Sequence, residues 1–112
     1  MDIIEVRDAG EWREWLTRNG RSADEVWLVL PHKGIPGVRY QEAVEQALCF
    51  GWIDGLHRKH DPGHSRLRFT PRRRRSSWSA LNRARATRLT TAGLMTDAGQ
   101  AAIDQAKATG AW

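Results

Sequence analysis

The stretch that decides the fold is residues 40–55, YQEAVEQALCFGWIDG, which predicts a helix, a tight turn and then a strand. Four apolar residues recur at the spacing of one helical face: Ala43, Val44, Ala47 and Leu48. Gly51 can end this helix, because glycine tolerates the backbone angles of a sharp turn. Trp52 then begins the strand. These residues predict packing, and they contain no catalytic signature.

The patterns on either side extend this prediction to the whole chain. Apolar and alternating segments predict strands at residues 3–6, 25–30, 52–60 and 66–70. Capping residues and apolar periodicity predict helices after Asp8, after Tyr40, after Ser76 or Ser77, and after Thr96. We therefore predict one α+β domain over residues 1–112. In it, a small and mainly antiparallel sheet packs against the first two of about four helices.

Several large or charged residues have a predicted place in this packing. Most of the tryptophans lie on the apolar side of their elements and are expected in the core: Trp12, Trp15, Trp27, Trp52 and Trp78. In the third helix, the stripe expected to face the core is Trp78, Leu81, Arg85 and Leu89. Trp112, at the end of the chain, is the exception, because it is free either to be exposed or to pack back onto the fold.

Cysteine usage and hydropathy bear on the compartment. The single cysteine, Cys49, cannot form an internal disulfide, which favours a reducing compartment. The first ten residues carry acids where a signal peptide would be basic, and the longest apolar runs are far too short to span a bilayer. We therefore expect a cytoplasmic protein without a transmembrane segment.

Charge is divided unevenly along the chain. Residues 1–55 carry 6 Lys or Arg and 10 Asp or Glu, a net charge of −4, whereas residues 56–112 carry 12 and 3, a net charge of +9. Fifteen of the 18 cations are arginine, which favours bidentate contacts with carboxylate or phosphate. The basic half therefore faces either an external anion or the acidic half of the same chain.

The arginine-rich segment 58–88 is the first candidate binding site. Its candidate residues are Arg58, Arg66, Arg68, Arg72, Arg73, Arg74, Arg75 and Trp78. The arginines would contact the phosphates of a nucleic acid, with Trp78 or Phe69 stacking on bases. The alternatives are an acidic protein or lipid surface, and a solvated face partly paired with the acidic half. For Arg72 the alternative is a structural role, in which its guanidinium forms a forked ion pair with the Asp54 carboxylate.

Three motifs in order resemble a known bacterial family. They are EAVEQALCFGWIDG at 42–55, RFTPRRRRSSWSALN at 68–82 and AGLMTDAGQAAIDQAK at 92–107. These resemble the N-terminal part of the YdeI/OmpD-associated, or bacteriocin-protection, family, whose members continue with a further helical segment. The resemblance implies a non-enzymatic accessory protein that binds a partner and is linked to resistance to cationic antimicrobial peptides and bacteriocins. It implies no established reaction.

An enzyme of unknown reaction is the remaining alternative. Its pocket would bring together Lys33, Tyr40 and Asp54, although Asp54-Gly55 is also ordinary turn chemistry. We assign no catalytic residue, cofactor or metal. The histidines at 57, 60 and 64 have poor spacing for a metal site, because strand residues three apart face opposite ways. Cys49 is expected to be packed and inert.

Overall fold

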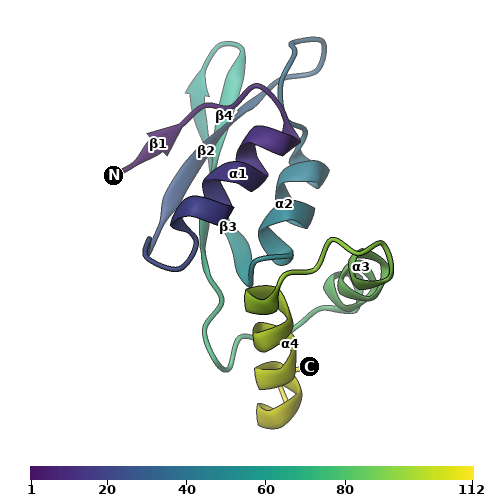
Figure 1. The fold of residues 1–112 in the computed structure, drawn as a ribbon. Helices are drawn as coiled ribbons and strands as arrows, with labels where there is room; N and C mark the ends of the chain where they lie inside the picture. Colours follow the sequence, from purple (N-terminus) through teal and green to yellow (C-terminus); the bar gives the residue numbers. More distant parts are fainter.

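The computed structural model describes residues 1–112 as four strands and four helices. The strands are β1 (Ile3–Ile4), β2 (Val26–Pro31), β3 (Trp52–Asp61) and β4 (His64–Pro71). The helices are α1 (Ala9–Asn19), α2 (Tyr40–Leu48), α3 (Ala80–Thr91) and α4 (Asp97–Thr109). The strands form one sheet in the order β1-β2-β4-β3, in which only the β1–β2 pair is parallel (Figure 1). The predicted α+β class, with a mainly antiparallel sheet and four helices, is confirmed.

The β3–β4 hairpin forms one side of the sheet, with β3 at the edge and β4 paired to β2. Its turn is closed by the Asp61 carboxylate, whose Oδ1 accepts a 2.9 Å hydrogen bond from the backbone N–H of Gly63. Along β4, Leu67 and Phe69 are buried, while Arg66 and Arg68 alternate with them and point to the other face. The predicted half-buried strand is therefore confirmed.

Helices α1 and α2 cover one face of the sheet and form the main core with it (Figure 1). Asp8 caps α1 by accepting a 2.9 Å hydrogen bond from the N–H of Glu11. The indole of Trp12 is fully buried and donates a 3.0 Å hydrogen bond to the carbonyl of Ala43 in α2. This bond satisfies the indole and fixes α1 against α2.

A second, smaller core lies beyond one end of the sheet, where α3 and α4 pack (Figure 1). Its buried residues are Leu48, Cys49, Trp78, Ala86, Leu89, Ile103 and Ala106. The last turn of α2 and Cys49 enter this core, and Gly51, with φ +78°, turns the chain back into β3. The central stretch 40–55 therefore joins the two cores. None of the helices has the length and apolarity needed to span a bilayer.

The start of α3 differs from the prediction. Ser79 caps the helix, instead of Ser76 or Ser77, by accepting a hydrogen bond from the N–H of Asn82. The preceding segment is extended because the N–H of Trp78 donates to the carbonyl of Ala111 at 2.9 Å. Leu81, expected in the core, is 59% exposed, and the buried residues of α3 are Ala86 and Leu89.

Most of the tryptophan predictions hold. The side chains of Trp12, Trp27, Trp52 and Trp78 are buried, and Trp15 is half-buried. Trp112 is half-buried as well, because it packs back onto the fold with its ring against that of Trp78, their centres 5.1 Å apart.

Candidate functional site

The face of the sheet opposite α1 and α2 is covered by arginine side chains. Trp27 and Val29 of β2 point to this face and are only 6% and 3% exposed, yet they belong to neither hydrophobic core. The guanidinium carbon of Arg66 lies 5.4 Å from the ring centre of Trp27. Because arginine can bury its aliphatic stem and keep its charge at the surface, this face is shielded from water but remains cationic.

Three of the predicted binding residues lie on this arginine face. Arg58 of β3 is directly opposite Arg66 of β4 in the sheet register, and Arg68 lies two residues further along β4. Arg58 and Arg66 form no ion pair, and Nε of Arg66 is buried without a hydrogen-bond partner. Like charges directly opposite one another destabilise a strand pair, so an anion placed here would relieve repulsion.

Arg68 differs from its two neighbours because it has an acidic partner. Its Nε lies 2.6 Å from Oε1 of Glu25, which also accepts a 3.1 Å hydrogen bond from the indole of Trp27. The hydrogen bond from Arg68 lowers the pKa of the Glu25 carboxyl. Arg68 is thus partly neutralised by the acidic half of the chain, whereas Arg58 and Arg66 are not.

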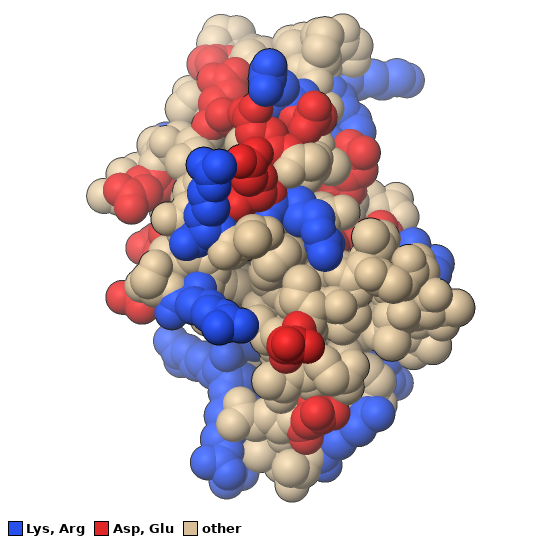
Figure 2. Space-filling model, in the orientation of Figure 1, with Lys and Arg blue, Asp and Glu red and all other residues tan.

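The loop after β4 extends the positive charge. Arg73, Arg74 and Arg75 are exposed and form no ion pair. In Figure 2, lysine and arginine side chains run along the lower left, where this loop passes in Figure 1, while acidic side chains gather over α1 in the upper part. Only the pairs Arg68–Glu25 and Arg88–Glu45 join the basic half of the chain to the acidic half. Internal pairing therefore leaves most of the basic half free.

Arg72 and Trp78 are placed differently from the other predicted residues, because they belong to the fold. The guanidinium carbon of Arg72 lies 3.8 Å from the ring centre of Trp78, which is itself 5% exposed in the second core. Nε and Nη1 of Arg72 are buried without a hydrogen-bond partner, and burial lowers its pKa to about 10. With Trp78 covered in this way, it has no free ring face to stack on a base. The same holds for Phe69, which is fully buried.

The alternative ion pair between Arg72 and Asp54 does not form. The Asp54 carboxylate instead accepts a 3.0 Å hydrogen bond from the hydroxyl of Tyr40. Burial, with that hydrogen bond as a smaller cause, raises the pKa of Tyr40. Asp54 still acts on Arg72 at longer range, since its charge partly offsets the lowering of the Arg72 pKa.

The predicted enzyme pocket is also absent. Lys33 is exposed in the β2–α2 loop and makes no hydrogen bond or ion pair with Tyr40 or Asp54. No cavity of the structure is lined by any of these three residues. The histidines are engaged separately: Nε2 of His57 lies 2.7 Å from Oγ of Ser65, and Nδ1 of His64 lies 2.8 Å from Oδ1 of Asp61.

Two other features are possible sites, the thiol of Cys49 and one cavity. Cys49 is fully buried, and burial raises the pKa of its thiol, so it lacks the thiolate character of a nucleophile. A cavity between α1 and α4 brings Arg21 and Phe50 close to Ala98. The sequence contains no local signal for this grouping, because its members lie far apart along the chain.

Comparison with known proteins places the chain in a family. Residues 4–102 match the model of the family described as Domain of unknown function (DUF8412). The chain belongs to this family. The match begins within β1 and covers β2 to β4, α1 to α3 and the first residues of α4, so the arginine face and the loop both lie within the DUF8412 domain. No curated protein and no solved structure matches the chain. The resemblance to YdeI/OmpD-associated proteins therefore stays a prediction.

Proposed function

We propose that this DUF8412 protein is a non-enzymatic binding protein whose arginine face holds nucleic acid by its phosphates. The observation that carries the proposal is the pair Arg58 and Arg66, opposite one another on the uncovered face without an acidic partner. Guanidinium groups match phosphate oxygens in bidentate geometry, and a phosphate between the two would replace their repulsion with attraction.

The shape of the surface favours a single strand bound with little sequence preference. The arginines lie on one face of the sheet, and the loop residues Arg73–Arg75 follow at the end of β4. Together they offer positive charge along which the phosphate backbone of a nucleic acid can lie. The aromatic rings near these arginines, Trp27 and Trp78, are covered by Arg66 and Arg72, so base stacking adds little. Contacts to phosphate position a strand but do not read its sequence.

A labelled single-stranded oligonucleotide tests the proposal by fluorescence anisotropy over a series of salt concentrations. The double variant Arg58→Glu/Arg66→Glu should lose affinity about tenfold or more and lower the slope of log K against log salt by about two, one for each phosphate contact. The control is Arg7→Glu/Arg18→Glu, which makes the same change in net charge just before α1 and in its last turn. It should retain most of the affinity.

Three outcomes would reject the proposal. The first is that the wild-type protein does not bind at low salt, where phosphate contacts are strongest. The second is that the two double variants lose affinity equally, which would show an effect of net charge alone. The third is that the protein binds vesicles of anionic phospholipid and does not bind the oligonucleotide, which would make a lipid surface the ligand.

A second candidate function follows from the acidic side of the molecule. Figure 2 shows acidic side chains gathered over α1, where Glu5 and Asp8 are exposed and form no ion pair. The resemblance to YdeI/OmpD-associated proteins supports retention of cationic antimicrobial peptides on this side. Calorimetry with a cationic amphipathic peptide tests it. Peptide binding should weaken in Glu5→Gln/Asp8→Asn and persist in Arg58→Glu/Arg66→Glu. If the wild-type protein gives no heat of binding, this candidate function is rejected.

A further inference from the structure

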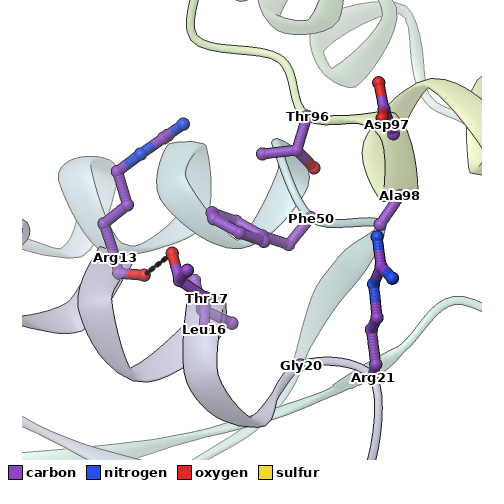
Figure 3. A pocket seen from close by; sticks show the side chains of 9 residues that line it. All are labelled: Arg13, Leu16, Thr17, Gly20, Arg21, Phe50, Thr96, Asp97 and Ala98. Atoms are coloured by element: carbon purple, nitrogen blue, oxygen red, sulfur yellow. Dashed lines mark hydrogen bonds between the residues drawn. The ribbon is translucent and has the colours of Figure 1, made fainter.

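The space between α1, the α2–β3 turn and the start of α4 lies on the side of the molecule away from the arginine face. Here the structure contains a cavity of about 420 Å³ (Figure 3). Its walls include Leu16, Arg21, Phe50, Thr96 and Ala98. The volume lies within the range of roughly 300–1,000 Å³ that is typical of small-molecule sites.

The walls of this cavity are held rigidly on the α4 side. The carbonyl of Cys49 accepts hydrogen bonds from both the backbone N–H and the hydroxyl of Thr96, at 3.1 and 2.5 Å. A Cβ at Gly99 would lie 2.2 Å from the same carbonyl oxygen, so α4 is packed as closely as glycine allows. The start of α4 therefore cannot move inward to fill the space.

Arg13 fixes the opposite wall. Its guanidinium donates to the side chain of Gln46 and to the carbonyl of Leu94, both at 2.9 Å, and its carbon lies 5.1 Å from the ring centre of Phe50. One side chain thus ties α1 to α2 and to the α3–α4 loop, with the Phe50 ring beneath it. The cavity is preformed, because each of its walls is held by contacts of this kind.

The cavity is lined by two arginines and one aspartate, a net charge of +1, beside one apolar surface. Arg21 extends across it toward Ala98 and makes no hydrogen bond or ion pair, even with Asp97 beyond Ala98 (Figure 3). The ring of Phe50 projects from the α2–β3 turn toward α1, where Leu16 adds further apolar surface. An unpaired guanidinium and an aromatic ring on different parts of one lining suit a ligand that carries an anionic group on a flat apolar body.

We propose that this cavity binds a small organic anion, a carboxylate or phosphate monoester attached to an aromatic or other flat apolar group. The anionic group pairs with Arg21, and the apolar body lies on Phe50. The site shares no residue with the arginine face, so the two proposals can be tested independently.

Benzoate and phenyl phosphate are the probes for the test, titrated at millimolar concentration into the ¹⁵N-labelled protein and followed by two-dimensional NMR. At least one of them should shift the amide signals of Arg21, Phe50 and Ala98 with saturation. Arg21→Gln removes an exposed charge without disturbing the core, and it should weaken binding about tenfold, the effect of losing roughly 1.4 kcal/mol of charge-assisted hydrogen bonding. The matched control, Arg18→Gln on the outer side of α1, should bind as the wild type does.

Two further probes distinguish a specific binding site from weak, nonspecific adsorption. Benzylamine carries the same ring with the opposite charge and should leave the three signals in place. Inorganic phosphate should bind much more weakly than phenyl phosphate, because it has no group to place on Phe50. The proposal is overturned if neither aromatic anion shifts these signals, if Arg21→Gln binds as tightly as Arg18→Gln, or if benzylamine or inorganic phosphate binds as well as the aromatic anions.

Discussion

The guanidinium of Arg72 lies over the indole of Trp78, with its carbon 3.8 Å from the ring centre, at the junction of the two cores. The backbone N–H of Arg72 also donates to the carbonyl of Gly51 at 2.8 Å. Arg72 thus joins the end of β4 to the α2–β3 turn and to the core of α3 and α4. Among the four consecutive arginines 72–75, it is the one whose side chain packs against a core residue.

The first prediction concerns the buried charge of Arg72. Arg72→Ala should lower the free energy of unfolding by about 1–3 kcal/mol, because it removes the contact with Trp78 and leaves a gap. Arg72→Met keeps an unbranched chain over the ring and removes a guanidinium with two unpartnered nitrogens, so it should be close to neutral or stabilising. Urea denaturation measures both. A loss in Arg72→Met as large as that in Arg72→Ala would show that the charge itself stabilises the junction.

Tyr40 gives a direct measurement of the contact with Asp54, since it is the only tyrosine in the chain. Ultraviolet titration of the folded protein should show a phenol pKa above the ordinary value of about 10, because of burial and the hydrogen bond to Asp54. Asp54→Asn should bring the pKa down. The urea-unfolded chain should give the ordinary value and serves as the control.

The same shift of Tyr40 has a consequence for stability. A pKa that is higher in the folded than in the unfolded state means that the unfolded chain loses its proton first as the pH rises. The contribution is therefore complete below the unfolded pKa and is lost as the pH rises through the folded one. An unchanged phenol pKa on folding would contradict both expectations.

The hairpin turn should make stability depend on acid. The hydrogen bond from His64, and then that from the N–H of Gly63, lower the pKa of Asp61. This contribution is therefore present above the unfolded pKa of about 3.9 and is lost as the pH falls below it. Asp61→Asn keeps an acceptor for Gly63, so it should reduce the drop in urea midpoint between neutral pH and pH 3 without abolishing folding. Asp24→Asn, which removes a carboxylate without a hydrogen bond or ion pair, is the control and should leave the drop unchanged.

Gly99 tests how closely α4 approaches the central turn. Gly99→Ala should destabilise the protein by about 1–3 kcal/mol, because its Cβ would lie 2.2 Å from the backbone carbonyl oxygen of Cys49 and 2.4 Å from the sulfur of Met95. Gly10→Ala in α1 is the matched helix variant, since its Cβ would meet only the Asp8 side chain, at 3.3 Å. It should be far milder, and thermal unfolding compares the two. Equal melting temperatures would mean that α4 shifts freely.

Local chemistry determined most of the secondary structure. Alternation along β4, the caps at Asp8 and Thr96 and the left-handed turn at Gly51 depend on neighbouring residues, so they can be predicted from sequence. The beginning of α3 could not be predicted in this way. Several serines there can cap, and the hydrogen bond between Trp78 and Ala111, 33 residues away, decides among them.

The sequence by itself determined the α+β class, the hairpin and the arginine content of the basic half. Only the tertiary structure decided which arginines are free. It covers Trp78 with Arg72, pairs Arg68 with Glu25 and leaves Arg58 opposite Arg66 without an acid. The physical reason is that a charge is neutralised by its neighbours in space. The acids that neutralise this half are Glu25, just before β2, and Glu45 in α2, both distant in sequence from the arginines they pair with. The cavity between α1 and α4 has the same origin, since its walls meet only when the two cores are packed together.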